Sequence, residues 1–135
     1  MTIRVETGYQ PPSTDGIPAL ALQAICLVNS YMLWIGITEE DGPDAAIAAG
    51  KLTADWACAI PPIGVSFNDT SATSLLRSSS SDLSLSVSQR LARRFKKQIF
   101  LSIDIPASLA SSSQGARAIL EAEKFLVKTL KELES

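Results

Sequence analysis

The pattern of apolar and polar residues changes period once within residues 84–105, SLSVSQRLARRFKKQIFLSIDI. Val87, Leu91 and Phe95 recur every four residues, which predicts a helix that gathers them in one apolar stripe. The other side of this helix and its end carry five basic residues: Arg90, Arg93, Arg94, Lys96 and Lys97. After the helix the period changes to two, which predicts a strand with one face formed by Ile99, Leu101, Ile103 and Ile105.

Alternation also predicts a first strand over residues 2–9. Two apolar runs on either side of the polar pair Asn29–Ser30 predict a hairpin over residues 19–37. The second hairpin strand is apolar at both alternating sets of positions, which indicates that both of its faces are covered. The chain's own helices can cover one face, and we expect a partner subunit on the other. The candidate interface residues of this strand are Tyr31, Leu33, Trp34 and Ile35.

The sequence pattern of residues 44–60 is compatible with either a helix or a strand. Asp44 before an alanine-rich run is typical of a helix start, whereas Gly50 and the alternation of Trp56, Cys58 and Ile60 favour a strand.

Two serine-rich segments separate the later elements. Residues 70–86 predict a flexible loop, because serine competes with helix by bonding to the local backbone, and residues 107–114 predict a second connector. Residues 115–134 predict a long terminal helix that docks on the sheet through Ile119, Leu120, Leu126, Val127, Leu130 and Leu133. The fold class expected is α+β: a largely antiparallel sheet of about six strands with two helices packed against it.

Length and composition fit a single domain over residues 1–135. The 12 basic and 14 acidic residues give a net charge of −2, so the basic cluster of the first helix is a local feature. We expect neither a signal peptide nor a membrane span, and Cys26 and Cys58 fit small buried hydrophobes of a reduced protein better than a disulfide. These features favour a cytoplasmic location and leave a nuclear one open.

The chain has few of the residue types from which catalytic and metal-binding sites are usually built. The chain has no histidine, two distant cysteines and only scattered glycines, so we expect no catalytic triad, metal site, nucleotide loop or other cofactor site. The acidic run Glu39–Asp41 fits a solvated turn better than a pair of acid and base groups.

The basic run itself allows three interpretations. It is a solvated helix face that complements the helix dipole, a surface for an acidic protein, or a nucleic-acid site. Aromatic residues make up only 6% of the chain and none is interleaved with the basic residues, which disfavours nucleic acid. Trp34 and Trp56 fit a core role better than an interface role.

Three blocks of the sequence resemble the proteasome assembly chaperone 4 family. Residues 89–103, QRLARRFKKQIFLSI, resemble the family's Q-R-L-A-R helix that runs into a K-Q-[VI]-F-[VL]-S strand. Residues 29–36, NSYMLWIG, resemble its turn and F-L-W-V-G strand, and Ile60–Pro61 with Val65–Ser66 resembles its I-P-V-S segment. The blocks are in order over about residues 20–134. By this resemblance the chain is identified as a fungal-type member of the family.

The resemblance favours a strand within residues 44–60, and it implies a function that the residues alone do not. Family members are non-catalytic chaperones that form a heterodimer with a second small chaperone, related to proteasome assembly chaperone 3. The pair assists early assembly of the α-ring of the 20S proteasome, contacts the α5 ring subunit and leaves before maturation. We therefore expect the strand at residues 31–37 to serve the chaperone partner and the basic helix face to serve the ring subunit, with residues 70–86 as a further candidate contact.

Two alternatives belong to other classes of protein. One is a small adaptor or scaffold domain of profilin-like or roadblock-like shape that binds an unrelated partner. The other is an enzyme that uses carboxylates alone and requires Glu39, Glu40 or Asp41 to face a pocket.

Overall fold

A computed structural model of the chain describes residues 3–12, 18–38, 55–61, 71–76, 83–105 and 113–134. These residues form the following strands and helices: β1 (Arg4–Gln10), β2 (Ala19–Leu27), β3 (Ser30–Thr38), β4 (Trp56–Ile60), β5 (Ser71–Leu76), α2 (Leu83–Phe95), β6 (Gln98–Asp104) and α4 (Ser113–Glu134).

The strands form one six-stranded sheet in the order β1-β2-β3-β6-β4-β5. All neighbours are antiparallel except the central pair β3 and β6, which is parallel and places Leu33 beside Leu101. The predicted fold class, a largely antiparallel sheet of about six strands with two helices, is therefore confirmed.

The β2–β3 hairpin turns one residue earlier than predicted. Leu27 pairs with Ser30, so the turn consists of Val28 and Asn29, and Ser30 already belongs to β3. Asn29 has a φ of 54°, a left-handed conformation that asparagine adopts more readily than most residues.

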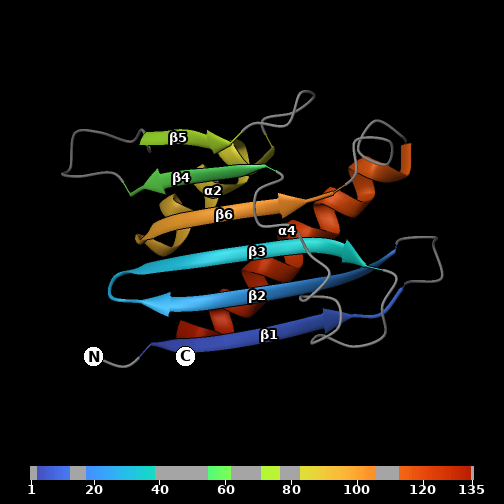
Figure 1. Cartoon of the computed structure of the whole chain (residues 1–135), viewed down its shortest axis with the longest axis horizontal. Coiled ribbons are helices and arrows are strands. Elements are labelled where there is room, and N and C mark those ends of the chain that lie inside the picture. Colours follow the sequence, from blue (N-terminus) through green and yellow to red (C-terminus); the bar gives the residue numbers. More distant parts are fainter. Residues whose placement is uncertain are drawn as a thin grey trace.

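Both helices lie on the same face of the sheet (Figure 1). In Figure 1, α4 crosses β1, β2 and β3, while α2 lies along β6, β4 and β5. One core cluster joins the sheet to both helices, and it includes Leu20, Leu22, Leu33, Ile35, Ile99, Leu101, Leu91 of α2, and Leu126 and Leu130 of α4. The apolar stripe predicted for α2 is thus core-facing. The stripe predicted for α4 is core-facing at Leu126, Val127, Leu130 and Leu133, but the prediction is wrong for Leu120, which is 52% exposed.

Small residues bring the helices close to the sheet. A Cβ at Gly8 of β1 would lie 2.9 Å from the Phe125 ring, so glycine lets α4 approach the edge of the sheet. On α2, the buried side chains include two serines beside the apolar stripe, Ser84 and Ser88. Ser88 satisfies its hydroxyl within the helix by donating to the carbonyl of Leu85 at 2.9 Å.

The two-residue connection from α2 to β6 depends on Lys96. Its backbone N–H donates to the carbonyl of Ala92 at 2.9 Å, and its φ is 56°. A left-handed residue at this position ends a helix and redirects the chain. The strand therefore begins at Gln98, as the change of period predicted.

A buried polar cluster fixes the start of α2 against β6. The Ser84 hydroxyl donates to the Asp55 carbonyl at 2.5 Å and accepts from the Ile103 N–H at 3.2 Å. The Ser84 N–H also donates to the Asp55 carboxylate at 3.4 Å, which provides a negative charge at the helix N-terminus. Ser84 is fully buried and Asp55 is 5% exposed.

The serine-rich loop predicted over residues 70–86 is wrong in two places. Residues 71–76 form strand β5, and α2 already begins at Leu83. Strand β5 is stabilised by antiparallel pairing with β4, a long-range contact that local serine content does not reveal.

Within residues 44–60, the predicted strand is confirmed at β4, and residues 44–54 lie outside the described residues, as do the motif at 65–66 and the connector at 107–112. No helix in the described part of the chain is long and apolar enough to cross a membrane.

We expect Ser84→Ala to lower the free energy of unfolding by about 0.5–1.5 kcal/mol, because it removes the buried hydroxyl that donates to the Asp55 carbonyl. The Ile103 N–H keeps the Asp55 carbonyl as its acceptor at 3.0 Å, so it is not left unsatisfied. Thr7→Val, which removes an exposed hydroxyl from β1 and keeps a β-branched side chain, is the control and should change stability by less than about 0.5 kcal/mol. Urea unfolding of both variants measures the difference. Equal effects of the two variants on the free energy of unfolding would contradict the stabilising role assigned to the buried Ser84 hydroxyl.

Candidate protein-interaction surfaces

The four candidate interface residues of β3 divide between the two faces of the sheet. Tyr31, Leu33 and Ile35 face the helices and belong to the core cluster, with exposed fractions of 4%, 1% and 0%. The prediction that they contact a partner directly is therefore corrected: the chain's own helices cover them. Trp34 alternates with them and faces the helix-free side of the sheet.

The helix-free face holds the Trp34 indole close to the strand backbone. A Cβ at Gly36 would lie 2.7 Å from Trp34 Cζ2, so glycine leaves the space that the indole occupies. Trp34 packs with Ala21 in a second small cluster and is 6% exposed. The preference for a core role is thus confirmed for Trp34. Trp56, which also faces this side, is half-buried.

An apolar row crosses the helix-free face from β1 to β4 and ends at the polar Thr73 of the edge strand β5. The strand register places side by side Val5, Ile25, Met32, Phe100, Cys58 and Thr73. Val5 is 51% exposed, and Ile60, at the end of β4 on the same face, is 45% exposed. No described helix covers this row. Ile25, Met32, Phe100 and Cys58 are half-buried, so the row is a partly exposed apolar surface and a candidate interaction site.

The predicted basic residues lie on the opposite, helical side of the molecule, but they do not act alike. Arg93, Arg94 and Lys96 are exposed. Arg90 instead forms a bidentate ion pair with Glu123 of α4, at 2.6 and 3.0 Å. The hydrogen bond to Glu123 raises the pKa of Arg90. Arg90 therefore joins the two helices, while the other three are available to a partner.

Lys97 belongs to a polar cluster that fastens the end of α4. Its Nζ lies 2.9 Å from Glu134 Oε1, donates to the Tyr31 hydroxyl at 3.1 Å, and stands 4.8 Å above the Tyr31 ring. The Tyr31 hydroxyl in turn donates to Glu134 Oε1 at 3.0 Å. Arg4 of β1 adds a hydrogen bond to the carbonyl of Leu133 at 3.4 Å. Lys97 and Tyr31 are thus positioning residues rather than free contact residues.

The cluster shifts the pKa of each of its members. The hydrogen bond with Glu134 raises the pKa of Lys97, and the hydrogen bond from Lys97 lowers the pKa of Glu134. Burial raises the pKa of Tyr31. All three groups therefore keep their neutral-pH charge states, and the cluster persists across the physiological range.

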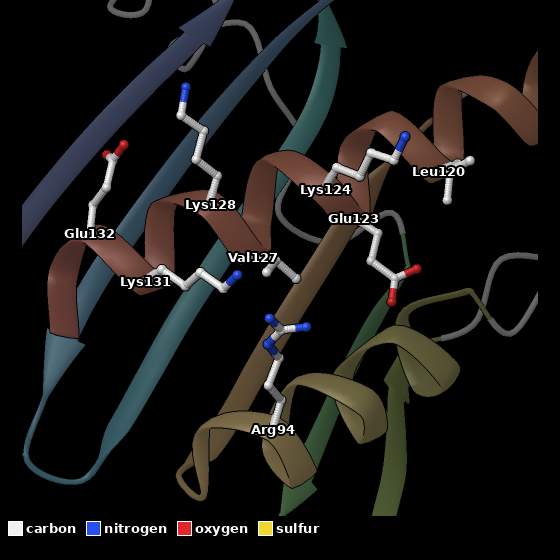
Figure 2. Close-up of a pocket in the computed structure, with 8 residues that line it drawn as sticks. All are labelled: Arg94, Leu120, Glu123, Lys124, Val127, Lys128, Lys131 and Glu132. Carbon is white, nitrogen blue, oxygen red and sulfur yellow. The ribbon is translucent and has the colours of Figure 1, made fainter. Parts of the chain in front are cut away.

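A groove between α2 and α4 was not foreseen from the sequence (Figure 2). Its cavity of about 620 Å³ is lined by Arg94 of α2 and one stripe of α4: Leu120, Glu123, Lys124, Val127, Lys128, Lys131 and Glu132. An adjoining cavity of about 290 Å³ shares Arg94, Glu123 and Val127 and extends to Arg90, Leu91 and Arg93. The signal in the sequence was the set of lysines between the apolar positions of α4, but their proximity to α2 depends on the tertiary fold.

The described residues hold no group of three or more His, Cys, Asp or Glu side chains that could bind a metal ion. Cys26 and Cys58 are both free thiols. Glu39, Glu40 and Asp41, the carboxylates of the enzyme alternative, lie outside the described residues.

Comparison with known proteins decides the family. The family described as Proteasome assembly chaperone 4 matches residues 19–105, which is more than half of the chain. The chain belongs to the proteasome assembly chaperone 4 family. This confirms the identification made from the three sequence blocks, two of which lie in β3 and in α2 with β6.

A solved structure supports the same fold for this family member. It is the crystal structure of a novel chaperone complex for yeast 20S proteasome assembly, one chain of which matches with a TM-score of 0.59. The match covers 96% of this chain and 95% of that chain at 15% sequence identity. At that identity the likeness establishes a shared fold. No curated protein matches the sequence.

For this proteasome assembly chaperone 4 family member, we expect Glu134→Gln to lower the free energy of unfolding at pH 7 by up to about 1 kcal/mol, the usual range for a partly exposed ion pair. Because the pKa of Glu134 is lowered from 4.5 in the folded chain, its contribution is complete above pH 4.5 and disappears as pH falls through the folded pKa. The difference from wild type should therefore vanish in acid. Urea unfolding of wild type and variant, at pH 7 and at a pH below the folded pKa of Glu134, measures this difference in the free energy of unfolding.

Glu121→Gln is the control for this experiment. Glu121 pairs with Lys124 at 3.6 Å, and the lysine side chain is 63% exposed, so removal of this pair should change stability very little. A Glu134→Gln effect that persisted unchanged in acid would contradict the assignment of the stabilisation to the charged carboxylate.

Proposed function

We propose that this chain is a non-catalytic chaperone in the assembly of the 20S proteasome. It pairs with a second small chaperone of related fold, and the pair assists early assembly of the α-ring, with the α5 ring subunit as the favoured contact. The observation that carries the proposal is membership of the proteasome assembly chaperone 4 family over residues 19–105. The free thiols of both cysteines support a reduced, cytoplasmic location.

The pairing is assigned to the helix-free face of the sheet. This face has an apolar row that reaches across five of the six strands, with half-buried Ile25, Met32 and Phe100 at its centre and exposed Val5 near its edge. Covering this row with a second sheet removes apolar area from water without moving either helix. The original assignment of the partner to β3 is retained, but on the Met32 and Trp34 side of that strand.

The ring subunit is assigned to the helical side. Arg93 and Arg94 are exposed there, whereas Arg90 already has Glu123 as its partner. The two assigned surfaces lie on opposite sides of the sheet, so the chain can bind both partners at once.

Two binding surfaces on opposite sides of the sheet suit a chaperone that acts as a template for ring assembly. An apolar sheet interface gives a lasting pair, while exposed basic residues accelerate the encounter with an acidic surface and contribute little to permanent affinity. Transient electrostatic contact permits release when the ring is complete.

We expect the double variant Val5→Lys and Ile60→Lys to lose the second small chaperone. Val5 and Ile60 are about half exposed, so the unpaired chain tolerates lysines there, whereas pairing would bury two charges without partners. Leu120→Lys is the matched control, since Leu120 is 52% exposed on the helical side. Affinity purification of the tagged chain from its own cells, with mass spectrometry, measures recovery of each partner.

For the wild-type chain, this purification should recover one second small chaperone and α-ring subunits without mature core particle. Val5→Lys with Ile60→Lys should lose the chaperone by at least about tenfold, and Leu120→Lys should keep it. Retention of the chaperone by the double variant would contradict the assigned face. Recovery of unrelated signalling or trafficking proteins instead would contradict the assembly role and favour an adaptor.

A further inference from the structure

The groove between α2 and α4 is elongated along α4. Its α4 lining residues run from Leu120 to Glu132 at spacings of three and four, so they form one continuous stripe of the helix. At 1.5 Å per residue this stripe is about 18 Å long, which matches roughly three turns of a helix laid beside it. The adjoining cavity continues the groove over α2.

The walls of the groove are basic, although the chain as a whole is acidic. The lining includes four cations, Arg94, Lys124, Lys128 and Lys131, and two carboxylates, Glu123 and Glu132. In Figure 2, Glu123 points toward α2, whereas Lys128 and Glu132 project from the other flank of α4. Glu123 is neutralised by the bidentate pair with Arg90. In Figure 2, Arg94 of α2 and Lys131 of α4 project into the space between the helices. Among the described residues, none pairs with Arg94, Lys128 or Lys131.

The floor of the groove is apolar. Val127 lies between the two helices at half-buried depth, and Leu120, one end of the stripe, is 52% exposed. A bulky apolar side chain of a ligand would cover both residues and release the water that now contacts them. A ligand that satisfies the groove therefore combines carboxylates with an apolar anchor.

The combination of basic walls and an apolar floor favours one class of anionic ligand over others. The lining residues include no aromatic side chain on which a nucleic-acid base could stack. Arg94 of α2 and Lys131 of α4 project from the two helices into the space between them, whereas a lipid surface would contact a convex or flat face. An amphipathic helix, by contrast, presents carboxylates on both flanks of one apolar stripe and fits between two helices.

We propose that the α2–α4 groove binds an acidic amphipathic helix of a protein partner, with its carboxylates toward Arg94, Lys128 and Lys131 and an apolar side chain on Val127 and Leu120. The inference rests on the proposed function only in taking the ring subunit as the source of this helix. The groove itself is testable without the proteasome.

The test uses the full chain and a fluorescein-labelled, helix-forming peptide of about twelve residues, with leucines on one face and glutamates flanking them. Fluorescence anisotropy should show binding that weakens as salt rises. Lys128→Glu with Lys131→Glu should weaken binding at least about tenfold, and Lys96→Glu, an exposed charge reversal outside the groove, by less than about twofold. Leu120→Ser should weaken binding without changing the salt dependence.

A charge-swapped peptide, with lysines in place of the glutamates, keeps the test decisive. It should bind the Lys128→Glu and Lys131→Glu chain better than it binds wild type. The proposal is overturned if Lys96→Glu weakens binding as much as the groove variant, or if a glutamate peptide without leucines binds equally well. Stronger binding of an RNA oligonucleotide or an anionic vesicle at the same residues would also overturn it.

The two proposals fail separately. Peptide binding that depends on the groove, in a chain that recovers no α-ring subunit from cells, would remove the ring assignment and keep the groove. Recovery of the α-ring by the Lys128→Glu and Lys131→Glu chain, with its peptide binding lost, would place the ring contact elsewhere. Recovery of the ring without any peptide binding by wild type would remove the groove and keep the assembly role.

Discussion

Packing of both helices on one face of the sheet is the constraint on which the other features of this structure depend. Leu91 of α2 and Leu126 of α4 share one core cluster with Leu33 and Leu101 of the central strands. Because the helices occupy the same face, the other face keeps an apolar row that the described helices do not cover. Polar contacts at the ends fix the helices in place: Ser84 and Asp55 at the start of α2, and Lys97 and Glu134 at the end of α4.

Local periodicity in the sequence was sufficient to predict most helices and strands. It did not predict which segments pair over long distances along the chain. The change of period near residue 98 correctly placed α2 and β6, and both amphipathic stripes proved to pack in the core, except at Leu120 of α4, which is exposed. Strand β5 was missed because its serines and threonine become strand only by pairing with β4. The basic cluster was predicted by residue number, but the partners of its members were not, since Lys97 is 66 residues from Tyr31 and Arg90 is 33 residues from Glu123. Likewise, an apolar strand does not reveal which face the chain's own helices cover, and Leu33 and Ile35 were therefore misassigned.

Two surfaces of opposite chemistry lie on opposite sides of the sheet. The helix-free side carries an apolar row over five of the six strands, a surface suited to lasting association through desolvation. The helical side concentrates basic residues in a chain of net charge −2, a surface suited to fast and salt-sensitive encounter. An assembly chaperone needs both properties, because it must remain with its own partner and yet release the particle that it helps to build.

The most direct test of this account is site-specific photo-crosslinking in the cells that make the protein. A photo-reactive phenylalanine analogue replaces Ile60 on the helix-free face or, in a separate chain, Leu120 on the helical face, two positions of similar exposure at 45% and 52%. The account predicts that the analogue at Ile60 crosslinks to a second small chaperone and the analogue at Leu120 does not. A chaperone crosslink from Leu120 alone would contradict the central claim that the uncovered sheet face is the pairing surface.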